Sequence, residues 1–372
     1  MAQVPLKEGL DEKALLRLAR NLKKVHPGLK DKEFICAGLD GLDQLELKDR
    51  VKHVAACLRE YLPASYPVAL KVIVRSQKNW DRGDAEDPYR GFAAWPLFQF
   101  IETNGLQHFD LSMNALAELT GLFSAEFAVR PFIDSDSPRA FQLMLGWSKH
   151  SDADVRRLAS ECCRPRLPWA SLLTDLIKNP KPVFKILENL KDDSSEYVRR
   201  SVGNHLNDIA KDHPELVIDI CEKWLKNATP NRRWIVGRAT RTLVKEGHPQ
   251  VWALLGFSPA PQVKIESFQV SPPRLQLGGL LSFSFKLKGC THLIQRLAVD
   301  YAIHFVKADG SLRPKVFKLK VLNLSAEETV VVTKSQRLKY ISTRKYYSGR
   351  HLVEILVNGQ SLGKKAFELT ID

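Results

Sequence analysis

The chain has 372 residues, a formal net charge of +14 and an apolar fraction of 44%, a composition typical of soluble globular proteins. This length favours two domains, and no run of residues approaches the roughly 20 apolar residues that would span a bilayer. The N-terminal residues show no signal-peptide pattern, and the six cysteines form no CxxC pair or zinc-finger spacing. We therefore expect a cytoplasmic protein with free thiols, no metal and no cofactor.

Residues 1–257 predict helices throughout. Apolar residues recur at three- and four-residue spacing, as at Leu15, Leu18 and Leu22, and the breaks fall at Pro, Gly, Asn and Asp. Residues 111–149 predict three short helices, with Ser124 as the N-cap of "AEFAVRPFI". Glu126 and Arg130, at i and i+4, then form an ordinary helical ion pair.

A repeat occurs within this helical half. "DADVRRLASE" (152–161) aligns with "SSEYVRRSVGN" (194–204), which matches Val155 with Val198, and an arginine pair follows each valine. "TPNRRWIVGRATRTL" (229–243) is a degraded third copy. The spacing is that of helix-pair repeats, so residues 1–257 predict an all-α, HEAT-like repeat solenoid in which corresponding side chains form rows on one surface.

Helical spacing places charged side chains beside the apolar stripe of each repeat. Arg157 and Glu161 are i, i+4 neighbours, and the alignment matches them with Arg200 and Asn204. Asp208 lies one turn further along. These residues are predicted to share one basic face. The third copy adds four arginines to it: Arg232, Arg233, Arg238 and Arg241.

The residue pattern alone leaves a plainer interpretation open. Arg157 and Glu161 could form an exposed ion pair worth a few tenths of a kcal/mol. Trp169 precedes Leu172 and Leu173 closely and could be an ordinary core residue.

Residues 258–372 change from helical to strand periodicity. The linker "SPAPQ" is followed by seven short runs with alternating apolar and polar residues, and "ADG" and "NGQ" provide hairpin turns. This pattern predicts an all-β, immunoglobulin-like sandwich. The segment holds 18 Lys/Arg and 8 Asp/Glu, an excess that favours contact with a polyanion such as nucleic acid.

Several motifs together resemble the AlkC branch of the HEAT-like-repeat alkylpurine DNA glycosylases: "FSAEFAVRPFI", "VRRLASECCRPRLPWA", "YVRRSVGNHLNDIAKDHP" and "TPNRRWIVGRATRTL". The resemblance covers essentially the whole chain, including the appended Ig-like domain. It implies excision of cationic alkylated bases, chiefly N3-methyladenine, without full base flipping. It also implies catalytic roles for Glu126, Glu161, Asp208 and Trp169. The DNA-binding residues it implies are Arg156, Arg157, Arg164, Arg199, Arg200, Asn204, Arg232, Arg233, Arg238 and Arg241.

We therefore predict a DNA repair glycosylase, a monomer without membrane contact that acts on double-stranded DNA containing alkylated bases and associates with the nucleoid. Two alternatives remain at this point. A non-enzymatic repeat protein that binds damaged or structured DNA would use the same arginines. A protein-interaction scaffold would show no affinity for DNA at about 0.1 M salt.

Overall fold

The computed structural model describes residues 5–341 and 344–371, and the chain divides into two compact units. The first unit contains the chain up to Asp212 together with Thr229–Ile235. The second contains His213–Ala228 and the chain from Val236 onward. In the described part of the chain, no helix is both long enough and apolar enough to cross a membrane.

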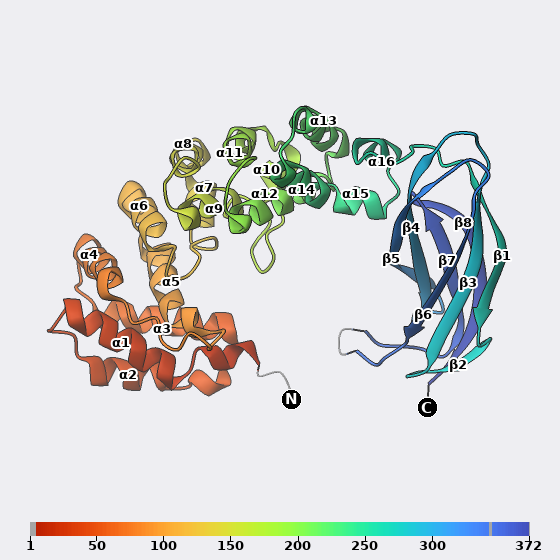
Figure 1. Ribbon diagram of the computed structural model, residues 1–372. Coiled ribbons are helices and arrows are strands. Elements are labelled where there is room, and N and C mark those ends of the chain that lie inside the picture. The colour runs from red at the N-terminus through yellow and green to blue at the C-terminus, as the bar shows by residue number, and fades with distance from the viewer. Residues whose placement is uncertain (1–4, 342–343, 372) are drawn as a thin grey trace. The chain divides into compact units, whose positions relative to one another are not determined.

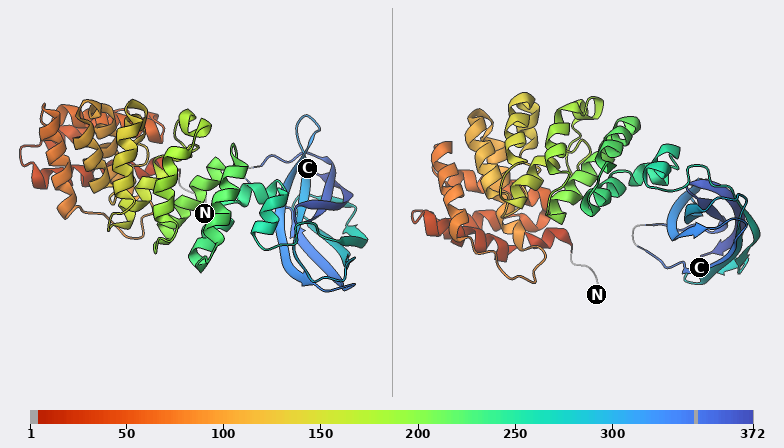
Figure 2. Two further views of the ribbon diagram at one scale, coloured as in Figure 1. Left: turned by 90° about the horizontal axis from the view of Figure 1, so that it is seen from above. Right: turned by 45° about the horizontal axis from the view of Figure 1, so that its top comes forward.

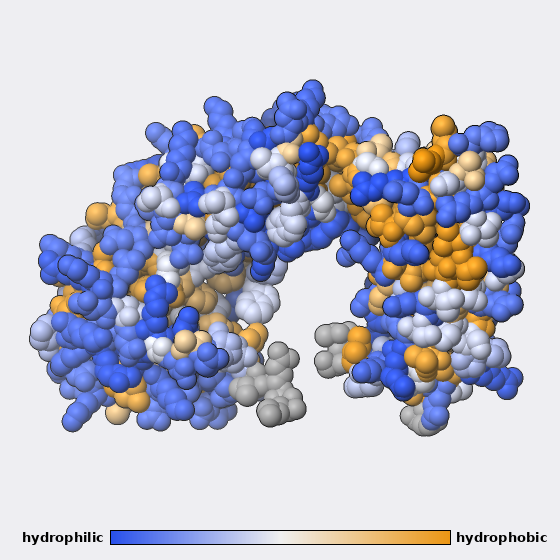
Figure 3. Space-filling model, in the orientation of Figure 1, coloured by the Kyte–Doolittle hydropathy of each residue, from blue (hydrophilic) through white to orange (hydrophobic). Residues whose placement is uncertain are grey.

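The first unit is built from α-helices that follow one another in chain order (Figures 1 and 2), and its visible surface is mostly hydrophilic (Figure 3). The α-helices that lie wholly in this unit are α1 (Glu12–Val25), α2 (Asp31–Leu39), α3 (Leu47–Tyr61), α4 (Tyr66–Ser76), α5 (Trp95–Asn104), α6 (Phe109–Leu119), α7 (Arg130–Ser135), α8 (Ser137–Trp147), α9 (Ala153–Glu161), α10 (Thr174–Lys178), α11 (Phe184–Leu190) and α12 (Glu196–Ile209). Short 3₁₀ helices lie before α1 at Leu6–Gly9 and between the α-helices at Leu42–Gln44, Gln77–Asn79, Arg90–Ala94, Leu106–His108 and Lys181–Val183.

The two clearest copies of the repeat become the packed helices α9 and α12. Asp152 caps α9 by accepting a hydrogen bond from the Asp154 backbone N–H at 2.8 Å. The matched valines, Val155 and Val198, are both buried. The α9 helix ends at Glu161, just before a segment with prolines at 165 and 168, which cannot continue a helix.

The first arginine of each repeat pair has the same structural role in both copies. Arg156 Nη1 donates to the carbonyls of His150 and Ser151, at 2.9 and 2.7 Å. Arg199 Nη1 donates to the carbonyls five and six residues before it, at 2.7 and 2.8 Å. Asp193 ties the copies together, because its carboxylate accepts from Arg156 Nε at 2.6 Å. These arginines therefore fasten the loop in front of each helix.

The segment after α6 departs from the predicted local structure. Ser124 is not an N-cap: turns occupy residues 125–129, and α7 begins at Arg130 with Pro131 in its first turn. The Ser124 hydroxyl bonds the Glu126 carboxylate at 2.7 Å instead of a backbone N–H. Because the segment is not helical there, the predicted i, i+4 pair of Glu126 and Arg130 is also wrong.

The second unit combines helices with two β-sheets (Figures 1 and 2). Its helices are α13 (Pro214–Leu225), α15 (Arg241–Lys245) and α16 (Pro249–Leu254), and α14 (Pro230–Ala239) contributes residues to both units. The strands are β1 (Val263–Ser271), β2 (Arg274–Gln276), β3 (Leu280–Gly289), β4 (Gln295–Val306), β5 (Leu312–Leu324), β6 (Thr329–Arg337), β7 (Gly349–Val357) and β8 (Gln360–Thr370). The sheet orders are β1-β3-β6 and β2-β8-β7-β4-β5.

The sandwich core explains the alternation in the sequence. Phe283, Phe285 and Tyr301 are buried in one cluster, and along β3 the buried residues alternate with more exposed ones. The predicted all-α segment followed by an all-β, Ig-like segment is confirmed. The last helix ends at Leu254 and the first strand begins at Val263. The compact units do not divide there, since α16 packs with α13 and Gly247 packs against Gly359, so the 257/258 boundary stays a prediction.

Candidate active site

Three carboxylates, which we call the carboxylate cluster, meet in the first unit: Glu126, Glu161 and Asp208. Their side chains are 14%, 7% and 3% exposed. Glu126 lies in the turn before α7, Glu161 is the last residue of α9, and Asp208 is in the last turn of α12. Charges so deeply buried require partners, because desolvation without compensation is costly.

Two arginines join the three carboxylates. Arg157 pairs with Glu126 through a short contact and with Glu161 Oε1 at 3.3 Å. Arg164 donates through Nη1 to the same Glu161 oxygen at 2.7 Å and through Nε to Asp208 Oδ2 at 2.9 Å. Glu161 and Asp208 therefore lie on opposite ends of one guanidinium, as expected if they share a face.

Neighbouring side chains complete the network. Lys211 Nζ lies 3.2 Å from Asp208 Oδ1, and the guanidinium of Arg157 lies 4.7 Å from the centre of the Tyr197 ring. Ser124 accepts a hydrogen bond from Arg157 at 2.6 Å. The Arg157–Glu161 pair is thus a buried part of a network, and the interpretation of it as an exposed ion pair is wrong.

The electrostatics keep Glu161 ionised. Burial alone would raise the pKa of this carboxyl, but the charges of Arg157 and Arg164 and a hydrogen bond from Ser201 bring its pKa below the ordinary 4.5. Burial likewise opposes the charge on each arginine, but the neighbouring carboxylates raise the pKa of both guanidinium groups. Ordinary conditions therefore leave Glu161 and both arginines charged.

A neutral layer supports the cluster from behind. The hydroxyls of Ser160 and Ser201 lie 3.0 Å apart where α9 packs on α12. His205 is fully buried, which lowers its pKa to about 3, and its Nδ1 donates to the Ser160 carbonyl at 2.9 Å. Because His205 stays neutral, it adds no charge beneath Glu161.

Trp169 stands out from the loop after α9. Trp169 is 59% exposed. Its backbone φ is +66°, a left-handed conformation that favours glycine. The interpretation of Trp169 as a core residue is therefore wrong. An exposed tryptophan in a strained backbone indicates a constraint imposed by its surroundings.

Two cations hold the Trp169 loop. Lys48 Nζ, from α3, donates to the Trp169 carbonyl oxygen. Arg130 donates to three carbonyls of the loop: those of Cys162 and Arg164 at 2.9 and 3.0 Å, and that of Ser171 at 2.5 Å. Neither contact was predicted, because the partners lie more than 30 residues apart in the sequence.

The remaining residues predicted to bind DNA lie in different settings. Arg200 is exposed and pairs with Glu196 at 2.5 Å, and Arg233 is exposed. Arg232 pairs with Asp192 in the first unit. Asn204 is half-buried on α12. Arg238 and Arg241 are half-buried and belong to the second unit. Arg156, Arg157, Arg164 and Arg199 are engaged inside the protein as described.

The arrangement suits chemistry in which positive charge develops. Fixed carboxylates stabilise a cationic transition state without reorganising. Glu126 Oε1 carries no hydrogen bond or ion pair to the described residues, so it is available to a water molecule. Across residues 5–341 and 344–371, no group of His, Cys, Asp and Glu side chains is arranged to hold a metal ion.

Two family models match the chain. The model for "DNA alkylation repair enzyme" matches residues 123–243, which include the entire carboxylate cluster and Trp169. The model for "Uncharacterised protein YhaZ, C-terminal Ig-like domain" matches residues 264–371. Fold and site together thus define a DNA alkylation repair protein with an appended Ig-like domain.

Two similar proteins cover nearly the full length. The uncharacterized protein YhaZ of Bacillus subtilis (strain 168) is 36% identical over 95% of this chain and 96% of its own. The structure of Pseudomonas fluorescens alkylpurine DNA glycosylase AlkC, bound to DNA containing an abasic site analog, is 38% identical, with a TM-score of 0.91 over 98% of this chain and 99% of its own. The chain belongs to the AlkC-type alkylpurine DNA glycosylases, a family of DNA repair enzymes.

Proposed function

We propose that this protein hydrolyses the N-glycosidic bond of cationic alkylated bases, N3-methyladenine above all, in double-stranded DNA. The observation that carries the proposal is the guanidinium of Arg164, which holds Glu161 and Asp208 together at 2.7 and 2.9 Å near the loop of Trp169. Stability alone does not account for burying this charged cluster, because apolar residues of similar volume would often stabilise the fold equally well.

The chemistry follows from the charge of the lesion. An N3-alkylated adenine is already a cation, so it leaves as a neutral base without a proton from a general acid. The C1′–N bond breaks and leaves an oxocarbenium-like sugar. Glu161 and Asp208 stabilise that cation through their fixed negative charges. A water oxygen then bonds to C1′ and passes a proton to a carboxylate.

Glu126 is the best placed carboxylate to orient and deprotonate this water. It is the most exposed member of the cluster, and Arg157 and Ser124 bind only its Oε2. Trp169 provides an exposed ring whose face attracts the cationic base or sugar by about 0.5–2 kcal/mol.

The arginines divide into two groups in this proposal. Arg157 and Arg164 neutralise the carboxylate cluster, which would otherwise repel the phosphates. Exposed side chains such as Arg200 and Arg233 bind the backbone, with no preference for sequence. The basic Ig-like domain, with 18 Lys/Arg and 8 Asp/Glu from residue 258 onward, adds further phosphate contacts.

The relative from Pseudomonas fluorescens supports DNA as the partner, because it was solved with DNA that contains an abasic site analog, the kind of DNA left by base excision. We propose that this protein acts as a cytoplasmic monomer associated with the nucleoid. It bends the duplex to expose the lesion and does not draw the base fully out of the stack.

Base release from a duplex with a single N3-methyladenine tests the proposal. The expected result is a free methylated base and an alkali-labile abasic site, formed faster than in a duplex alone. A protein that binds the duplex with a steep salt dependence but yields no abasic product would instead be a non-enzymatic DNA-binding repeat protein.

A further inference from the structure

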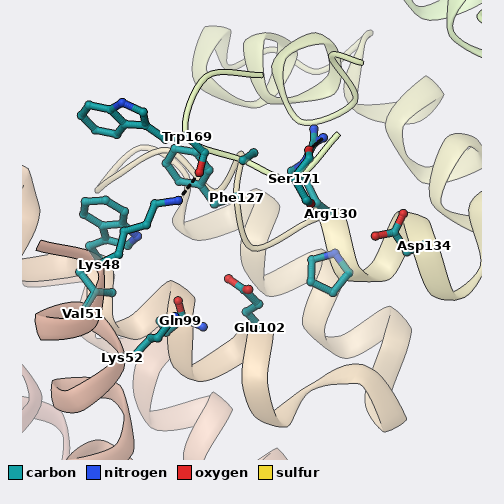
Figure 4. Close-up of a pocket in the computed structure, with 13 residues that line it drawn as sticks. Lys48, Val51, Lys52, Gln99, Glu102, Phe127, Arg130, Asp134, Trp169 and Ser171 are labelled. Carbon is teal, nitrogen blue, oxygen red and sulfur yellow. Dashed lines mark hydrogen bonds between the residues drawn. The ribbon is translucent and has the colours of Figure 1, made fainter. Parts of the chain in front are cut away.

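A cavity of about 200 Å³ is lined by residues 169–171 of the loop after α9 and by three further chain segments. The three further segments present residues at helical spacing: positions 48, 51 and 52 of α3, positions 95, 99 and 102 of α5, and positions 127, 130, 131 and 134 around α7. Figure 4 shows Lys48, Glu102 and Phe127, from three of these segments, around one space. The carboxylate cluster lies outside this lining, so the cavity is a separate feature.

Aromatic rings form one side of the cavity. Trp95 is buried and stacks on Phe127, with ring centroids 5.8 Å apart and an interplanar angle of 19°. Trp169 stands in the same lining with most of its surface exposed. Flat aromatic surfaces of this kind bind nucleobases by stacking, in a way that tolerates any base.

The cations around the cavity already have partners. Arg130 donates to the three loop carbonyls, and Lys48 donates to the Trp169 carbonyl. Lys52 lies 3.6 Å from Asp49. A phosphate would have to compete for these donors, so the cavity is poorly suited to an anion.

The carboxylates around the cavity, Glu102 and Asp134, in contrast have no ion-pair partner among the described residues. The Gln99 amide, which donates to Thr103 Oγ1 at 3.2 Å, is the neutral side chain that opposes the rise in the pKa of Glu102 on burial. Burial raises the pKa of Glu102, although Lys48 and Lys52 oppose this rise. A half-buried carboxyl with so little compensation favours a ligand that brings N–H donors.

We propose that this cavity binds a purine base with an exocyclic amine. The ring stacks beside Trp95, Phe127 and Trp169, and the amine donates to Glu102. The Gln99 amide Nε2 already donates to Thr103 Oγ1 at 3.2 Å, so its oxygen is the atom that accepts from the same amine. Two sources present this chemistry: the alkylated base released by excision, and an adenine of the DNA strand. This inference rests on the proposed function, because excision supplies the first source and duplex binding the second.

Ligand-observed NMR titration of the full chain tests the released-base source, with free adenine, free 3-methyladenine and unsubstituted purine, which lacks the amine. The wild-type protein should bind the two amines saturably and purine more weakly. Glu102→Ala and Glu102→Gln should each weaken adenine binding by at least about tenfold, as expected for a lost hydrogen bond to a charged group. Glu60→Gln, on the exposed surface of α3, is the matched control and should bind as the wild type does.

A second experiment tests an adenine of the DNA strand as the source. A duplex with 2-aminopurine next to an abasic site should change its fluorescence when the wild-type protein binds, and change it less with Glu102→Ala. A response in either arm that depends on Glu102 supports the proposal and identifies the source. It is overturned if neither arm responds, or if both Glu102 variants, folded by circular dichroism, match the wild type. Excision by the wild-type protein is measured separately. Excision without purine binding refutes only the cavity proposal, whereas absence of excision refutes the proposed function.

Discussion

Removal of the Arg164 side chain should destabilise the first unit more than removal of any exposed arginine. In Arg164→Ala, Glu161 loses its 2.7 Å partner and Asp208 loses its contacts at 2.8 and 2.9 Å. Both carboxylates then remain buried, at 7% and 3% exposure, with less compensation. Breaking a buried pair by removing one partner costs about 3–5 kcal/mol, and Arg157 and Lys211 offset only part of this.

Arg166 provides a matched control two residues further along the chain. It also forms a two-pronged pair, with Asp212 at 2.8 and 3.1 Å, but these side chains are 31% and 27% exposed. Arg166→Ala should therefore cost about 1 kcal/mol or less. Urea unfolding followed by helical circular dichroism at pH 7 measures both variants.

The loss of unfolding free energy in Arg164→Ala should also depend on pH. The folded protein lowers the pKa of Glu161, so this carboxylate stabilises the fold above its ordinary pKa of 4.5 and loses that contribution as the pH falls through the folded value. A protonated Glu161 needs no cation, so the gap between Arg164→Ala and the wild type should narrow in acid. Equal costs for Arg164→Ala and Arg166→Ala at pH 7, or a gap that widens in acid, would refute the reasoning.

Three further predictions concern Trp169, the pH profile and the arginines. Trp169→Ala and Trp169→Gly should each slow single-turnover excision by about tenfold. The free energy of unfolding should be about 1 kcal/mol higher for the glycine variant than for the alanine variant, because φ at this position is +66°. Equal stabilities of the two variants would contradict this. The excision rate should stay constant as the pH falls toward the ordinary 4.5 and drop only below it, because the pKa of Glu161 is lowered; a drop near pH 6 would count against Glu161. In salt titrations of duplex binding, Arg200→Ala should reduce the slope of log K against log salt by about 0.9. Arg156→Ala should lower the unfolding free energy and leave that slope unchanged, because its guanidinium holds the loop before α9.

Local periodicity in the sequence was enough to predict the helices that carry Glu161 and Asp208. The match of Val155 with Val198 placed the two helices in register, and four-residue spacing from Asn204 led to Asp208. That geometry is robust because α9 and α12 are regular, so side chains follow the helical period.

The parts that periodicity missed depend on contacts between distant residues. Spacing paired Glu126 with Arg130, but turns at 125–129 break the helix, and Glu126 pairs instead with Arg157, 31 positions away. Spacing was compatible with a core position for Trp169, but this residue is 59% exposed, and Lys48, 121 positions away, donates to its carbonyl. No local rule contains such contacts.

The strand missed in the second unit has a related cause. The short strand β2, Arg274–Gln276, pairs in parallel with β8 almost a hundred residues later. Two prolines precede it, and they indicate a turn and not a strand. Its three residues are too few to show alternation.

Single-turnover excision from a duplex with one N3-methyladenine, with duplex affinity and circular dichroism measured on the same samples, tests the central claim most directly. Glu161→Gln and Asp208→Asn should each lower the excision rate by about 100-fold or more while duplex binding persists. Glu126 is the least buried of the three carboxylates, so Glu126→Gln should slow excision with the smallest loss of stability. Normal excision rates in folded, DNA-binding forms of all three variants would contradict the assignment of the carboxylate cluster as the catalytic site.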